Sequence, residues 1–137
     1  MRTPCLIALG SMISLAACAR TTASLLTPGT SLPATCESAI MVYDTPAQAP
    51  SGYKEVALIK SEGHGLLTSP AAMRRSMRSK AASVGATGII LTGIDGPGTV
   101  SAAVETALSI PSRREGMALA IYSPADSSRT SACTTQR

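Results

Sequence analysis

Residues 69–94 have the sequence SPAAMRRSMRSKAASVGATGIILTGI and contain the signals for a helix that is followed directly by a strand. Ser69 can cap the helix, Pro70 suits the first helical position, and Gly85 can take the left-handed conformation that ends a helix. At about 100° per residue, one narrow stripe collects the apolar side chains Met73, Met77, Ala81 and Val84. The spacing therefore predicts a helix that packs one face and leaves the rest in water.

The segments around this helix contain short apolar runs bounded by turn residues, which predict strands at 38–43, 53–60, 87–94 and 117–122. Residues 100–108 follow helical spacing, although their Val and Thr content also allows a strand. The expected order is β-β-α-β-(α)-β. This order is typical of an α+β two-layer domain, in which one mixed sheet is covered by one or two helices. The helix between the second and third strands can make those strands parallel through a right-handed crossover.

The N-terminal eighteen residues show three zones: a short basic start at Arg2, an uncharged run of apolar or small residues over 6–17, and then Cys18. The uncharged run is about a dozen residues long, whereas a membrane-spanning helix needs roughly 20. This length is typical of the apolar region of a secretory signal peptide, which is removed from the mature protein.

The four residues Leu15-Ala16-Ala17-Cys18 resemble the lipobox of bacterial lipoproteins, Leu-(Ala/Ser)-(Gly/Ala)-Cys. The resemblance implies a diacylglyceryl thioether on Cys18, cleavage before it, and acylation of the new amine. Two or more acyl chains anchor a protein durably to a bilayer. Because Ala19, and not Asp, follows the cysteine, the resemblance further implies the outer membrane, with the domain facing the periplasm. The alternative is an ordinary signal peptide that is cleaved nearby.

We therefore expect a signal peptide at 1–17, a flexible tether at 18–35, one domain at 36–133 and a disordered tail at 134–137. The tether segment is rich in Thr, Ser, Pro and Gly and has no sustained period, although Leu25 and Leu26 could instead pack on the domain. Loss of Arg2 with the signal peptide lowers the formal net charge from +4 to +3. Because the protein would lie outside the cytoplasm, we expect no nucleic-acid partner. An envelope protein or an anionic envelope polymer is the candidate partner, although a charge this small does not by itself argue for one.

The mature chain retains Cys36 and Cys133, and an even pair of cysteines in an oxidising compartment predicts a disulfide. A bridge closing about 98 residues would contribute about 4–5 kcal/mol in the chain-entropy model. Such a bridge would help a core that has no Phe or Trp. The alternative is two separately used thiols.

The pattern Lys80-Ala-Ala-x-x-Gly-Ala-x-x-Ile89 resembles a helix-to-strand unit found in several small bacterial envelope lipoproteins. The outer-membrane stress sensor of the Rcs pathway and related lipoproteins contain this unit, as do small domains named for heavy-metal binding. The resemblance implies a small envelope domain with a role in stress sensing or interaction.

A row of arginines lies beside the apolar stripe of the predicted helix and is the main candidate interaction surface: Arg74, Arg75 and Arg78. One hypothesis is that this row meets anionic lipid, lipopolysaccharide, peptidoglycan or an acidic protein. The alternative is a solvated helix face.

His64 is the single histidine and lies between two glycines, and a metal site needs several convergent ligands. We therefore expect no metal site, no catalytic residues and no cofactor. The sequence favours a membrane-anchored envelope lipoprotein with a non-enzymatic role in interaction, structure or stress sensing. The alternative is a ligand- or metal-ion-binding module on the same anchor.

Overall fold

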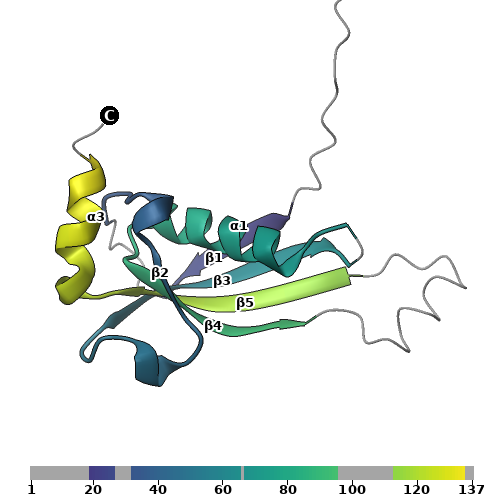
Figure 1. The fold of residues 1–137 in the computed structure, drawn as a ribbon, viewed down its shortest axis with the longest axis horizontal. Coiled ribbons are helices and arrows are strands. Elements are labelled where there is room, and N and C mark those ends of the chain that lie inside the picture. The colour runs from purple at the N-terminus through teal and green to yellow at the C-terminus, as the bar shows by residue number, and fades with distance from the viewer. Residues whose placement is uncertain (1–18, 27–31, 66, 96–112, 135–137) are drawn as a thin grey trace, which may run out of the picture.

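The computed structural model describes residues 19–26, 32–65, 67–95 and 113–134 (Figure 1). They form one five-stranded sheet in the order β1-β3-β5-β4-β2. The strands are β1 (Arg20–Leu25), β2 (Met41–Tyr43), β3 (Lys54–His64), β4 (Gly88–Asp95) and β5 (Arg113–Tyr122). Helix α1 (Pro70–Ser83) lies across one face of the sheet, and α3 (Ser127–Thr134) lies at one end. The predicted α+β fold with a mixed sheet is therefore confirmed.

The sheet is mixed because β2 pairs parallel with β4, whereas the pairs β1–β3, β3–β5 and β4–β5 are antiparallel. Both β3 and β4 are antiparallel to β5, so these two strands run in the same direction, as the predicted crossover requires. However, β5 lies between them. The helix α1 thus connects two strands of like direction that are not neighbours.

Helix α1 has the caps and the buried stripe that its sequence predicts. The Ser69 hydroxyl accepts a hydrogen bond from the backbone N–H of Ala72 at 3.1 Å, and Gly85 has a φ of +78° just beyond the helix. Met73, Met77 and Ala81 are fully buried against a cluster of sheet residues that includes Ile59, Ile89, Ala118 and Ala120. Burial of this stripe fixes α1 on the sheet.

The opposite face of the sheet is only partly covered. The connection between β2 and β3, which contains the 3-10 helix η2 (Pro46–Gln48), covers a second cluster formed by Tyr43, Ile90 and Ile121. Leu58 and Met117 lie on the same face further along the strands, and they remain 37% and 40% exposed.

The structure differs from the prediction of a flexible tether over 18–35, because Arg20–Leu25 forms the edge strand β1. The Thr21 hydroxyl is within hydrogen-bonding distance of both the Ser61 hydroxyl on β3 (2.9 Å) and the Ser76 hydroxyl on α1 (2.6 Å). These polar contacts, together with the backbone pairing, hold a strand that carries little hydrophobic signal of its own.

Three other predictions of local structure were wrong in extent. Strand β5 begins at Arg113, before the predicted strand at 117–122, and its partner β3 continues to His64, beyond the predicted strand at 53–60. The segment before β2 begins as the 3-10 helix η1 (Glu37–Ala39). The segment after β5, for which no helix was predicted, contains η3 (Pro124–Asp126) and then α3. The predicted element at 100–108 lies outside the described residues, as does most of the predicted tail at 134–137.

None of the helices in the described ranges is both long and apolar enough to span a membrane.

Candidate functional site

One end of the sheet gathers most of the charged side chains of the strands. At this end β1 and β5 begin and β3 and β4 finish (Figure 1). We call it the rim and define it by Arg20, Glu62, His64, Leu67, Arg113, Arg114 and Glu115. The strand registers pair Arg20 with Glu62, Glu62 with Glu115, and His64 with Arg113.

An ion-pair network lies just inside the rim on the open face of the sheet. The Lys60 ammonium is 2.8 Å from the Glu62 carboxylate and 3.7 Å from that of Glu115. The hydrogen bond from Lys60 lowers the pKa of Glu62, and the same bond raises the pKa of Lys60. Arg20, Thr22, Lys60 and Glu62 line a shallow polar depression of about 230 Å³. These groups are well solvated, so their ion pairs contribute little to stability.

The rim loop between β3 and α1 is tightly hydrogen-bonded. The backbone N–H of His64 donates to the Thr68 hydroxyl at 3.0 Å, and the backbone N–H of Thr68 donates back to the His64 carbonyl at 2.8 Å. Arg114 donates to the Gly65 carbonyl at 3.1 Å. Thr68 is buried, whereas the Leu67 side chain is 69% exposed. Leu67 therefore presents an apolar side chain to solvent next to the buried Thr68.

The single histidine lies at the end of β3 and is exposed. Within the described ranges, no three His, Cys, Asp or Glu side chains are grouped so that they could hold a metal ion.

Two of the three arginines predicted to form an anionic-partner surface contact η1. The Arg75 guanidinium is 3.5 Å from the Glu37 carboxylate, and Arg78 donates to the Glu37 carbonyl at 2.9 Å. Arg74 is exposed on the same helix. Because Glu37 neutralises part of this row, the row is less cationic than the sequence of the helix alone suggests.

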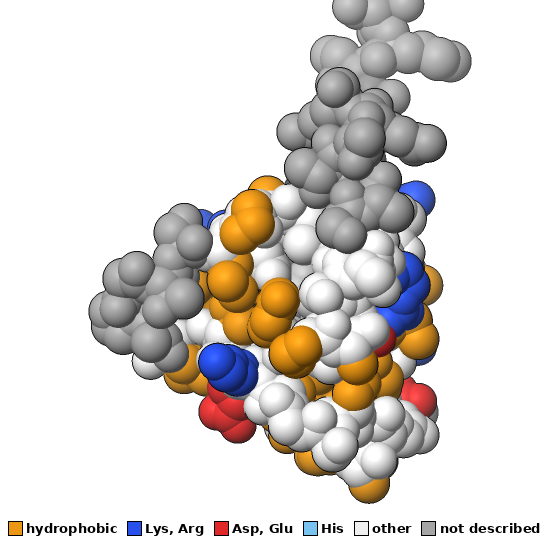
Figure 2. Space-filling model, turned by 90° about the vertical axis from the view of Figure 1, so that its left-hand side faces the viewer, with side chains coloured by type: hydrophobic (Ala, Val, Ile, Leu, Met, Phe, Trp, Pro, Cys, Tyr) orange, Lys and Arg blue, Asp and Glu red, His pale blue; other side chains and the backbone are white. Residues whose placement is uncertain are grey.

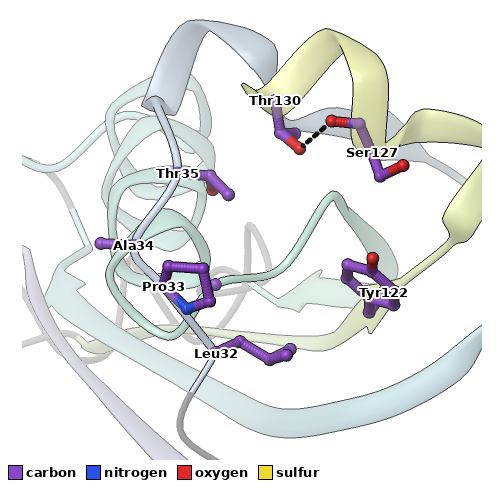
Figure 3. A pocket seen from close by; sticks show the side chains of 8 residues that line it. Leu32, Pro33, Ala34, Thr35, Tyr122, Ser127 and Thr130 are labelled. Carbon is purple, nitrogen blue, oxygen red and sulfur yellow. Dashed lines mark hydrogen bonds between the residues drawn. The ribbon is translucent and has the colours of Figure 1, made fainter. Parts of the chain in front are cut away.

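The opposite end of the molecule contains a groove of about 390 Å³ (Figure 3). Its walls come from four separate parts of the chain, namely the segment 32–35, Gly85, Tyr122 at the end of β5, and Ser127 and Thr130 of α3. Figure 3 shows Leu32 and Pro33 across the groove from Tyr122, with Ser127 and Thr130 above them. Figure 2, which views this end of the molecule, shows hydrophobic side chains across its middle and charged ones at its margins.

Hydrogen bonds fix two walls of the groove. Thr35 donates from its backbone N–H to the Ala82 carbonyl and from its hydroxyl to the Ala86 carbonyl, both at 2.9 Å. The Tyr43 hydroxyl donates to the Asp126 carboxylate at 3.1 Å and so ties the start of α3 to the sheet. Burial, followed by this hydrogen bond, raises the pKa of Tyr43. Sequence reasoning missed the groove, because residues 32–35 have the composition of a linker.

The predicted cysteine sites are only partly covered by the described residues. Cys36 directly precedes η1, and α3, whose backbone includes Cys133, contacts η1. The side chain of Cys133 lies outside the described part, as does the whole of Cys18, so the disulfide and the lipidation stay predictions.

Comparison with known proteins gives one likeness of fold. No protein-family model and no curated protein matches this chain. The crystal structure of the Francisella virulence factor FvfA is similar, with a TM-score of 0.50 over 74% of this chain and 96% of that chain. The two sequences are 13% identical. At this identity the likeness concerns the fold alone.

Proposed function

We propose that this chain is a lipoprotein of the bacterial cell envelope, anchored by lipid on Cys18, that acts as a non-enzymatic interaction, structural or stress-sensing module. The proposal places the domain on the outer membrane, facing the periplasm. The observation that carries it is the lipobox-like sequence Leu15-Ala16-Ala17-Cys18, which is followed after one residue by the first strand of the sheet.

The position of β1 supports the proposed cleavage site. Strand β1 begins at Arg20, and the residue before it, Ala19, packs against the hydrophobic core. Cleavage between Ala17 and Cys18 would therefore remove none of the described strands or helices. A cut only a few residues further along would remove part of β1 and its pairing with β3.

The contact between α3 and η1 supports the proposed Cys36–Cys133 bridge. A disulfide needs Cα atoms about 4.4–6.8 Å apart, so its two cysteines must come from neighbouring segments. Cys36 directly precedes η1 and Cys133 belongs to α3, and these two elements contact each other. The bridge would then join the two ends of the domain sequence beside the groove.

A second candidate function, binding of a small ligand, is favoured by the groove. Its lining combines apolar side chains such as Leu32 and Pro33 with the hydroxyl-bearing residues Thr35, Tyr122 and Ser127. The hydroxyls of Thr35 and Ser127 already donate to backbone carbonyls, so toward a ligand they would act as acceptors. Such a surface suits a small amphiphilic molecule, because apolar walls bury its hydrocarbon part and a few hydroxyls orient its polar part. A thermal shift with such a ligand, lost in Thr130→Trp, would favour this candidate.

Metabolic labelling with radioactive palmitate tests the leading proposal. We expect the wild-type chain to incorporate the label and Cys18→Ala to lose it. Cys5→Ala is the matched control, since it also removes a cysteine upstream of the domain, and it should label like the wild type. Equal labelling of Cys18→Ala and the wild type would contradict the lipid anchor on Cys18.

A further inference from the structure

Because β1 begins at Arg20, the connection between the proposed lipid on Cys18 and the folded domain is very short. Only Ala19 separates Cys18 from Arg20, and one residue spans at most about 3.6 Å, so the Cα atoms of Cys18 and Arg20 lie within about 7 Å. Ala19 itself packs on the core, and Thr21 contacts both Ser61 and Ser76. A flexible tether over residues 19–35 would have given a reach of roughly 20–25 Å.

With lipid on Cys18, this short connection would bring the N-terminal end of β1 to the bilayer. Arg20 lies at the rim, where β3 ends and β5 begins, so the other rim residues lie beside the anchor (Figure 1). The outermost level of the rim is basic and apolar, with exposed side chains of His64, Leu67 and Arg113. The acidic residues Glu62 and Glu115 lie two residues further in along their strands, about 7 Å from that level. Arg20, which pairs with Glu62, and the backbone of Asp95, which pairs with Glu115, lie at this same inner level.

We propose that the rim lies against the membrane surface, with Arg113 contacting anionic phospholipid headgroups and Leu67 entering the interface. This inference rests on the proposed lipid anchor. Lys60 sits between Glu62 and Glu115, and its charge is largely compensated there. The guanidinium of Arg114 is bound to the Gly65 carbonyl. Arg20 lies opposite Glu62, two residues in from the outermost level. Arg113 is therefore the arginine placed to meet headgroups, and an exposed leucine beside basic residues suits a bilayer interface.

The same orientation points the groove away from the membrane. Strand β3 extends from Lys54 to His64, ten residue steps or roughly 33 Å, so the turn before β3 lies well above the bilayer. The groove, at the end of the molecule remote from the rim, is then open to partners in the periplasm.

Single tryptophans test the orientation directly, because the chain contains no Trp of its own. We would place one at Leu67, on the rim, and as a matched control one at Ser51, an exposed residue at the far end. Each variant of the lipidated protein is reconstituted into vesicles of phosphatidylethanolamine and phosphatidylglycerol that contain brominated phospholipid. We expect strong quenching of Leu67→Trp and little quenching of Ser51→Trp. Equal quenching, or stronger quenching at Ser51, would overturn the proposal.

A second arm separates this inference from the proposed anchor. The chain 18–137 is joined chemically to a phospholipid through the amine of residue 18 and measured in the same vesicles. If the natural protein proves to carry no lipid, the anchor proposal fails, while this arm still reports whether a lipid at residue 18 brings the rim to the bilayer.

Charge reversal tests the headgroup contact. In the Leu67→Trp protein, Arg113→Glu reverses a rim charge, whereas Lys54→Glu makes the same charge reversal on an exposed residue at the opposite end of the sheet. A basic residue near an anionic surface changes partitioning about five-fold. We expect weaker quenching, by a few-fold at low salt, for Arg113→Glu and no change for Lys54→Glu. Equal effects of the two variants would refute the contact with anionic headgroups.

Discussion

The substitution Gly85→Ala should destabilise the domain strongly, because two separate penalties meet at this position. The φ of +78° is in the left-handed region, which costs a residue with a Cβ about 1–2 kcal/mol. A Cβ at Gly85 would also collide with the Leu32 Cβ and lie 2.8 Å from the Pro33 carbonyl oxygen. Overpacking of this kind costs about 1–3 kcal/mol. The expected loss in the free energy of unfolding is therefore about 2–5 kcal/mol.

Gly52→Ala is the matched control for this experiment. Gly52 has nearly the same φ, +77°, but a Cβ there would meet nothing within 4 Å. Gly52→Ala should therefore lower the free energy of unfolding only by the backbone contribution, about 1–2 kcal/mol. Urea denaturation followed by circular dichroism gives both losses, and comparable slopes would show that both variants unfold to the same extent. An equal loss in the two variants would refute the packing of Leu32 and Pro33 on the end of α1, and with it this wall of the groove.

Two further predictions concern the charged and phenolic side chains. Tyr43→Phe should cost about 1–3 kcal/mol, because it removes the hydrogen bond to Asp126. The pKa of Tyr43 is raised above 10.0 in the folded state, so its contribution is complete below pH 10 and is lost as the pH rises through the raised value. The alkaline decline in stability should thus be smaller in Tyr43→Phe, and an identical decline would argue against this bond. Lys60→Met should raise the pKa of Glu62 back toward 4.5, as measured by NMR of the carboxyl carbon. The small stabilisation from this pair is present above pH 4.5 and is lost as the pH falls through the lowered pKa. A Glu62 pKa that stays unchanged would show that the pair does not form in solution.

The sequence was sufficient for the elements whose signals are local. Ser69, Pro70 and Gly85 mark the ends of α1, and the spacing of Met73, Met77 and Ala81 identifies its buried face. Each of these signals acts within one helical turn or one residue, so no tertiary information is needed.

The elements that the sequence did not predict depend on partners distant in the chain. Strand β1 is held by pairing with β3 and by the hydroxyl contacts of Thr21, and neither is visible in the local pattern. The start of β5 is polar because Arg113 and Glu115 lie opposite His64 and Glu62 at the rim. Cross-strand partners, and not hydrophobic alternation, define the extent of these strands.

For the candidate sites too, features within one helix could be predicted, whereas features formed by distant segments could not. The arginine row is visible in the helix sequence, but its partner Glu37 lies in a segment about 40 residues earlier, so the neutralisation could not be predicted. The groove could not be predicted from the sequence, because its walls come from four segments that are distant from one another in the chain. Its one sequence signal is Gly85, which identifies the end of a helix and says nothing of the segment that packs on it.

The most direct test of the account is the intact mass of the membrane-extracted protein, measured with a Cys18→Ala control before and after reduction and alkylation. We predict a chain that lacks residues 1–17 and carries the mass of the lipid, and that gains two alkyl groups only after reduction, at Cys36 and Cys133. An uncleaved or unlipidated wild-type chain would contradict the anchor. Alkylation of the two late cysteines without reduction would contradict the bridge.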